Sequence, residues 1–164
     1  MRTVTMAMIA TVVLAGASLA AAEAAERDKP RNALIGTWVC DPSISTFNGA
    51  MPYRSATAKF IEVERGTHVI VDIVEANGVA LHFEYIDTED GTFVPVHGNP
   101  FYDNESTVWV DERTARRTER RGEEVTGTTI MTVAPDGKSY VARSSRTRPD
   151  GRLYTSLIHW KRAE

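Results

Sequence analysis

Cysteine is almost absent from this sequence, whose 164 residues contain one, Cys40. A lone cysteine excludes an intrachain disulfide framework and the paired cysteine spacings of structural zinc sites. Cys40 directly follows Trp38 and Val39, and no His or Lys stands beside it to lower its pKa. We therefore expect Cys40 to be a small, partly buried core residue and not a reactive thiol.

Motifs that carry familiar chemistry are missing as well. The chain has no Gly-rich phosphate loop, no dinucleotide-binding fingerprint and no nucleophile elbow. Its four histidines, His68, His82, His97 and His159, lack the close spacing of a metal-binding hairpin or helix. Acidic residues outnumber basic ones by 22 to 19, which argues against a dedicated nucleic-acid-binding protein. The sequence thus predicts no metal site and no nucleic-acid partner.

Long apolar runs are confined to the N-terminus. Arg2 precedes an apolar stretch over residues 4–20, and small residues at 20–24 offer two A-x-A cleavage sites. This pattern predicts a signal peptide over residues 1–24, cleaved near Ala22–Ala24, and hence a periplasmic or secreted protein. A membrane anchor is the alternative, but about 17 residues are marginal for a span. No later run is long enough to cross a bilayer, so we expect no transmembrane segment after cleavage.

The rest of the chain divides into a short leader and one domain. Residues 25–33 are charged and polar and include Pro30, which is typical of a disordered leader. Residues 34–164 have the length of a single domain with one core.

Short apolar-alternating runs, each closed by a glycine turn, fill this domain. Asn-Gly and Asp-Gly between alternating runs are strong hairpin signals, because the tight turn requires positive φ angles. No window has a sustained helical period. We predict an all-β fold, an antiparallel up-and-down (meander) β-barrel of about nine strands; a β-sandwich would need longer crossovers. The glycine turns are Arg65-Gly66, Asn77-Gly78, Asp90-Gly91, Arg121-Gly122, Asp136-Gly137 and Asp150-Gly151.

Two segments are expected to lack regular strands. Asp41-Pro42 should end a first strand over residues 34–39, leaving 41–53 as a loop or a single helical turn across one barrel end. Prolines make 92–105 a loop or edge. The predicted strands are 34–39, 57–64, 68–75, 79–86, 107–110, 114–120, 124–133, 139–147 and 152–162, with Trp38 and Trp160 buried.

Strands 114–120 and 139–147 carry arginines and have no clearly apolar face. In a closed barrel each must turn one set of side chains inward. An inward arginine would require a hydrated lumen, a carboxylate partner or an anionic ligand, because a buried unpaired charge is costly. The alternative is that both strands are short, at the barrel rim, with solvated arginines. The sequence leaves both readings open.

Candidate functional residues gather in and after the 79–86 strand. His82 and Glu84 share one face, where they could act as a general acid and base or simply be solvated. The loop over residues 95–103 combines Pro, Gly and Asn with His97 and Tyr102, and we expect it to fold over one barrel end near Tyr85. Its alternative role is a purely structural lid. The candidate ligand-binding residues are His82, Glu84, Tyr85, His97 and Tyr102; catalytic residues are not predicted.

Several of these motifs together resemble a family. Gly36-Thr37-Trp38, then His82-Phe83-Glu84-Tyr85 and Pro95-Val96-His97-Gly98-Asn99-Pro100, resemble exported bacterial lipocalin-like (calycin-type) β-barrel proteins. The resemblance covers residues 34–162. Because members are mostly uncharacterised, it implies a barrel and an exported location and carries over no catalytic residue. Related haem-binding barrels share the Gly-x-Trp strand, but the glycine-rich continuation is replaced here. We expect no cofactor, with haem held by His159 as the alternative.

The expected function is binding of a small apolar or amphipathic molecule by an exported barrel. An enzyme performing acid–base chemistry on such a molecule, of isomerase, cyclase or lyase type, is one alternative. An envelope structural protein whose barrel is filled by its own side chains is the other. An open lumen would favour the first two readings, and titratable groups facing that lumen would favour the enzyme.

Overall fold

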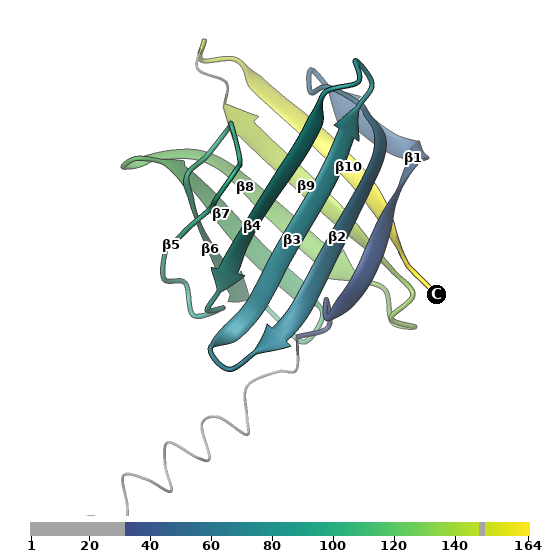
Figure 1. Ribbon diagram of the computed structural model, residues 1–164, viewed down its shortest axis with the longest axis vertical. Coiled ribbons are helices and arrows are strands. Elements are labelled where there is room, and N and C mark those ends of the chain that lie inside the picture. Colours follow the sequence, from purple (N-terminus) through teal and green to yellow (C-terminus); the bar gives the residue numbers. More distant parts are fainter. Residues whose placement is uncertain (1–31, 148–149) are drawn as a thin grey trace, which may run out of the picture. The chain divides into compact units, whose positions relative to one another are not determined.

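The computed structural model describes residues 32–147 and 150–164, and every regular element in them is a β-strand (Figure 1). The predicted signal peptide and residues 25–31 of the leader lie outside the described residues. The ten strands are β1 (Gly36–Asn48), β2 (Tyr53–Val63), β3 (Gly66–Glu75), β4 (Ala80–Asp87), β5 (Val94–Pro95), β6 (Asn104–Trp109), β7 (Thr114–Arg121), β8 (Glu124–Val133), β9 (Ser139–Thr147) and β10 (Leu153–Arg162).

The strands form one antiparallel sheet that curls into a barrel, which confirms the predicted fold class. The strand order is β4-β3-β2-β1-β10-β9-β8-β7-β6-β5, so neighbours in the sheet are neighbours in sequence except where β1 meets β10. Consecutive strands joined by short turns produce this up-and-down arrangement. The ends of the sheet meet at a seam between β4 and the segment after β5, where Glu84 and His97 exchange two backbone hydrogen bonds of 3.0 Å.

The first strand differs from the prediction. Asp41-Pro42 does not end it: β1 continues to Asn48 and pairs with β10 on both sides of an irregularity between Asp41 and Thr46. Pairing of β1 with β2 stops at Val39, so Pro42 lies in a bulged stretch. The N–H donor that proline lacks would form no hydrogen bond of the sheet there. The segment read as a loop is therefore mostly strand.

The irregular segment before β6 is close to the prediction. It contains the two-residue edge strand β5, which pairs with β6 and brings the total to ten. Gly98, in the loop that follows, has φ of +85°, and a Cβ there would collide with the carbonyl oxygen of His82. A glycine is therefore required where this loop passes β4.

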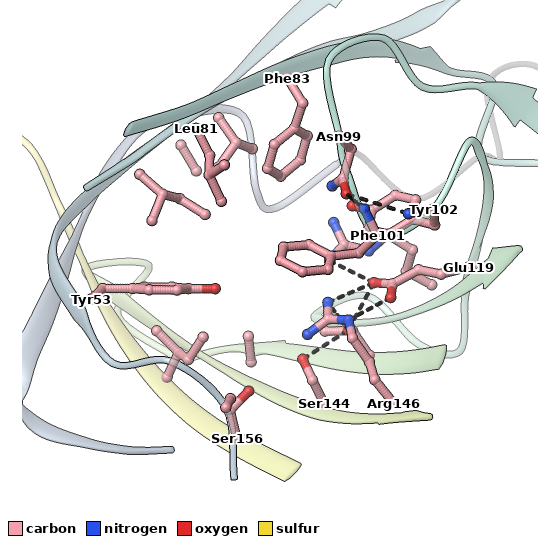
Figure 2. Close-up of a pocket in the computed structure, with 18 of the residues that line it drawn as sticks. Tyr53, Leu81, Phe83, Asn99, Phe101, Tyr102, Glu119, Ser144, Arg146 and Ser156 are labelled. Atoms are coloured by element: carbon pink, nitrogen blue, oxygen red, sulfur yellow. Dashed lines mark hydrogen bonds and ion pairs between the residues drawn. The ribbon is translucent and has the colours of Figure 1, made fainter. Parts of the chain in front are cut away.

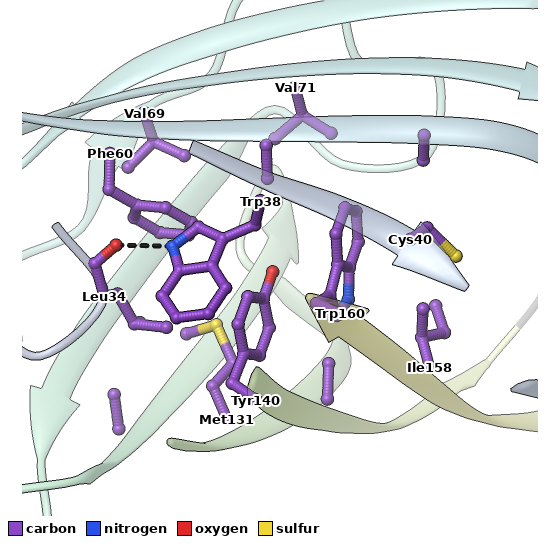
Figure 3. Packing of buried hydrophobic residues seen from close by; sticks show 14 of the residues in the cluster. Leu34, Trp38, Cys40, Phe60, Val69, Val71, Met131, Tyr140, Ile158 and Trp160 are labelled. Atoms are coloured by element: carbon purple, nitrogen blue, oxygen red, sulfur yellow. Dashed lines mark hydrogen bonds between the residues drawn. The ribbon is translucent and has the colours of Figure 1, made fainter. Parts of the chain in front are cut away.

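The buried hydrophobic residues form one cluster, part of which packs around Trp38 (Figure 3). Trp38 is fully buried and its Nε1 donates to the Leu34 carbonyl at 2.7 Å. Tyr140 packs edge-on against Trp38 and stacks on Trp160, with ring centroids 4.9 and 5.5 Å apart. Cys40 is buried too, and burial raises the pKa of its thiol to about 11. The predicted burial of both tryptophans and of Cys40 is confirmed.

Asn32, in the segment predicted as a leader, is hydrogen-bonded to residues of the barrel. The Asn32 side chain donates to Thr67 and Glu89, and its oxygen accepts from the Leu34 amide. Asn32 thereby holds the chain entering β1 against the strand ends opposite. No helix in the described part of the chain is long and apolar enough to cross a membrane.

Candidate ligand-binding site

A cavity of about 450 Å³ occupies the barrel interior and reaches the end at which the β1–β2 and β5–β6 loops lie (Figure 2). This volume lies within the range of small-molecule binding pockets. Its apolar lining comes mainly from β2, β3, β4 and β10, and its polar lining from β7, β8 and β9. The apolar side chains include Ala58, Phe60, Val71, Ile73, Leu81, Phe83, Met131, Ala142, Ile158 and Trp160.

The polar lining is arranged in rows across the sheet. Cross-strand pairing aligns Arg117 of β7 with Thr129 of β8, Ser144 of β9 and Ser156 of β10. The next row toward the open end aligns Glu119, Gly127, Arg146 and Tyr154, while the row on the other side consists of Ala115, Met131, Ala142 and Ile158. Because paired residues share a face of the sheet, the wall is polar near the mouth and apolar deeper in the barrel.

Glu119 lies at the centre of the polar rows and is fully buried. Arg146 donates to both carboxylate oxygens, from Nε to Oε2 at 2.5 Å and from Nη2 to Oε1 at 2.7 Å. Arg117 Nη2 lies 3.1 Å from Oε1, and Arg117 Nη1 donates to the Tyr85 hydroxyl at 3.1 Å. Thr129 also donates to Glu119. Two guanidinium groups thus share one carboxylate, a charge-assisted arrangement with bidentate geometry.

Gly127 makes room for this contact. It lies between Glu119 and Arg146 in the cross-strand row, so the two side chains must meet over its backbone. A Cβ at Gly127 would lie 2.7 Å from Glu119 Oε2 and 2.7 Å from Arg146 Cγ. A side chain at this position would therefore force the ion pair to shift or separate.

The electrostatics of the buried acids differ. Burial alone would raise the pKa of Glu119, but the charges of Arg146 and Arg117 outweigh it and hold that pKa below its usual value. Glu105, opposite Glu119 on β6, is also fully buried. Burial, with the nearby Asp87 carboxylate adding to it, raises the pKa of Glu105 well above its usual value. Glu119 is therefore the ionised acid, and the environment of Glu105 favours its neutral form.

The loop between β5 and β6 covers part of the mouth. The Asn99 side-chain oxygen accepts from the backbone amides of Phe101 and Tyr102, which fixes the turn. Arg121 donates to the carbonyls of Pro100 and Phe101 and ties the loop to β7. In Figure 2 the Phe101 ring points from this loop toward the cavity, facing Tyr53 across it. The predicted position of the loop over a barrel end is confirmed.

Three of the five sequence-predicted residues lie outside the cavity. His82 and His97 are exposed, and Glu84 is half-buried on the outer face of β4. His82 Nδ1 lies 2.7 Å from an Asp72 carboxylate oxygen, and His68 Nε2 lies 2.9 Å from Glu84. His82, Glu84 and His97, predicted as candidate ligand-binding residues, therefore do not line the lumen. On β4 the inward set is the alternate one, which contains Leu81, Phe83 and Tyr85.

The other two predicted residues point inward. Tyr102 lines the cavity and packs against Phe83, with ring centroids 6.2 Å apart. Its hydroxyl is buried without a hydrogen-bond partner among the described residues. Tyr85 is buried behind the lining, where its hydroxyl accepts from Arg117. A ligand-binding role for these side chains stays a prediction.

Sequence reasoning left out the polar residues that matter most in this geometry. It weighed the arginines of 114–120 and 139–147 without choosing a face, and the structure turns Arg117, Glu119 and Arg146 inward. Gly127, a glycine inside a strand pattern, was the signal that backbone and side chains meet closely there. Glu119 is therefore a carboxylate partner of both inward arginines.

His159, the residue of the haem alternative, is not among the residues that line the cavity. His159 alternates along β10 with Ile158 and Trp160, which line the cavity, and His159 does not. The residue expected to hold haem in the alternative reading therefore does not reach the lumen. Among the described residues no group of three or more His, Cys, Asp or Glu could hold a metal ion.

Comparisons with known proteins yield structural similarity only. No protein-family model matches the sequence, and no curated protein matches it. Among solved structures, zebrafish ileal bile acid-binding protein complexed with cholic acid is similar with a TM-score of 0.46 and 10% identity, over 80% of this chain and 100% of that one. The siderocalin Ex-FABP, described as functioning through dual ligand specificities, has a TM-score of 0.41 and 12% identity, over 80% and 75%. The fold of this chain is established by its own strand order and register.

Proposed function

We propose that this protein binds a small amphipathic organic molecule inside its barrel. The observation that carries the proposal is the cavity of about 450 Å³, which is apolar over most of its wall and open at the Phe101 end. Transfer of apolar surface from water into such a cavity is favourable by about 25 cal/mol per Å². A ligand with an apolar body and one polar end matches the two-sided lining.

The alternatives fare less well on the same geometry. A structural protein with a filled barrel would leave no internal volume of this size. An acid–base enzyme would need titratable groups around the lumen, whereas His82, Glu84 and His97 lie outside it. Two carboxylates line the cavity, those of Glu75 and Glu119. Glu119 is engaged by two arginines, and their charges favour its ionised form.

The test is binding of a neutral fluorescent probe, N-phenyl-1-naphthylamine, to the purified protein. We expect saturable enhancement of probe fluorescence and a change in emission from Trp160, which lines the cavity. Ala142→Trp should abolish binding, because Ala142 faces the cavity and a tryptophan there fills it. Arg143→Trp, one residue along on the exposed face of β9, is the matched control and should bind as the wild type does. Equal binding by both variants would contradict a site in the lumen.

We also propose that the protein acts outside the cytoplasm, in the periplasm or beyond. Support comes from the N-terminal sequence alone: Arg2, the apolar stretch 4–20 and the A-x-A sites. The intact mass of the protein recovered from the periplasmic or secreted fraction decides the point. We expect a mature N-terminus between Ala21 and Ala25, and a species that retains Met1 in the membrane fraction would overturn export.

A further inference from the structure

The charges that meet at Glu119 are unevenly balanced. Among the described residues, Arg117 and Arg146 each form an ion pair with Glu119 and with no other carboxylate. The two guanidinium groups are 11% and 16% exposed, and Glu119 is 0% exposed. Glu105, in an environment that favours its neutral form, does not supply the missing negative charge. A positive charge in excess is therefore held beside an apolar wall, which is costly unless an anion compensates it.

Donor groups around these arginines are also incompletely used. Arg117 Nε and the Tyr102 hydroxyl are both buried without a hydrogen-bond partner in the described structure, and both residues line the cavity. Buried polar groups normally have partners, and these two donors have none within the described structure. Figure 2 shows the Arg146 guanidinium at the lumen edge, with the Tyr53 hydroxyl pointing toward it from the opposite wall.

From this geometry we propose that the ligand is an organic anion, whose carboxylate or equivalent oxyanion binds Arg146 and Arg117 beside Glu119. This inference rests on the proposed function and specifies its ligand class. A guanidinium carries five N–H donors in a planar fork, so Arg146 can bind Glu119 and a second oxyanion together. The apolar body of the ligand then extends past Ala142 and Met131 toward Trp160, along the apolar rows deeper in the barrel.

The first test uses the wild-type protein and three ligands that share one alkyl chain: decanoate, decan-1-ol and decyltrimethylammonium. Each is titrated against the bound neutral probe, N-phenyl-1-naphthylamine. We expect decanoate to bind at least about tenfold tighter than decan-1-ol, a ratio that corresponds to about 1.4 kcal/mol, and the cation to bind most weakly. Equal displacement by all three would overturn the anion inference and leave the proposed function intact. Absence of probe binding would instead remove the proposed function itself.

Variants then locate the anion. Arg146→Gln should lose the preference for decanoate over decan-1-ol while retaining the affinity for the alcohol, and Arg146→Lys should keep part of it. Arg143→Gln, on the outer face of the same strand, is the control and should keep the full preference. Glu119→Gln should raise the affinity for decanoate, because it removes the competing carboxylate. A decanoate preference unchanged in Arg146→Gln would overturn the assignment; should that variant not fold, the wild-type ligand series and Glu119→Gln decide it.

Discussion

Glu105 is a carboxylic acid held in the barrel wall with little to bind it. One of its oxygens accepts from Thr107 Oγ1 at 3.3 Å, and the other has no partner in the described structure. Burial raises its pKa well above the usual value, so the folded protein keeps this proton where the unfolded chain has lost it. Protonated Glu105 therefore favours the folded state at low pH. This contribution to the free energy of unfolding is lost as the pH rises above about 4.3, the ordinary pKa of a glutamate. Asp87, whose pKa burial also raises, acts in the same direction.

We therefore predict that the free energy of unfolding falls between about pH 5 and about pH 8, and that Glu105→Gln makes this fall smaller. Gln has a similar shape and cannot ionise, so the variant lacks the free-energy cost that the buried carboxyl of Glu105 adds as the pH rises. Urea denaturation at both pH values measures the free energy of unfolding. Glu62→Gln, at an exposed position on β2, is the control. An identical pH dependence in wild type and Glu105→Gln would show that Glu105 ionises without cost in the fold.

Trp38 is a fully buried residue of the hydrophobic core. Besides its bond to Leu34 and its contact with Tyr140, its ring lies 4.2 Å from the guanidinium carbon of Arg162. Trp38→Ala should lower the free energy of unfolding by about 3–5 kcal/mol, since it leaves a cavity and an unpaired carbonyl. Trp38→Phe, which keeps much of the ring, should cost less. Chemical denaturation measures both, and a loss under about 1 kcal/mol for the alanine variant would contradict a core role.

Single residues show how far sequence reasoning reached. Trp38, Trp160 and Cys40 were predictable as core because each stands in or beside an apolar strand pattern. His82 and Glu84 were selected because their side chains can transfer protons. The opposite face of their strand is more apolar, and that face points into the barrel. Arg146 could not be placed, because its strand alternates between two polar sets and the choice depends on neighbours distant in sequence.

At the scale of elements, β8 shows how a strand accommodates a buried ion pair. Gly127→Ala keeps the strand but places a methyl group within 2.7 Å of Glu119 and Arg146, so the pair must shift or separate. We predict a loss of about 1–3 kcal/mol in the free energy of unfolding. Thr128→Ala, whose side chain is on the other face of β8, is the control and should change stability little. Equal stabilities of the two variants would mean that the pair adjusts freely.

The β5–β6 loop is predicted to control ligand exchange. Arg121→Ala removes both hydrogen bonds that tie Pro100 and Phe101 to β7. Because Arg121 is exposed, the free energy of unfolding should change by no more than about 0.5 kcal/mol. Stopped-flow fluorescence should show faster association and dissociation of N-phenyl-1-naphthylamine, while Arg116→Ala, exposed in mid-strand, leaves the rates unchanged. Unaltered rates in Arg121→Ala would indicate that the loop does not limit access.

Strands were predicted well where glycine turns and apolar alternation indicate the same boundaries. They were predicted less well where pairing with a distant strand overrides a local stop signal. The hairpins around Asn77-Gly78 and Asp136-Gly137 follow directly from turn chemistry. Asp41-Pro42 is a local stop signal, but β10 runs alongside it and pairs with β1 beyond the bulge. That partner lies more than a hundred residues away, so no local pattern could reveal it.

Among the described residues, the seam that closes the barrel has few backbone hydrogen bonds, at the bridges Glu84–His97 and Asp90–Val108. β2 and β3 pair over their whole lengths, whereas β4 meets the segment after β5 through the single bridge between Glu84 and His97. Regions with few hydrogen bonds open locally at lower free energy than the core. The Asn99–Tyr102 loop, which lines the cavity, continues directly from this seam, so opening of the seam and access to the cavity are physically linked.

We predict that the amide hydrogens of Glu84 and His97 exchange with solvent faster than those of β8 and β9, measured by native-state hydrogen exchange. A molecule bound in the lumen contacts the loop and stabilises only the closed barrel, so saturating decanoate should slow exchange at the seam more than in the β2–β3 hairpin. Arg143→Gln serves as a control that should show the same protection. Uniform exchange around the barrel, or protection by ligand that is no greater at the seam, would mean that ligand enters by another route.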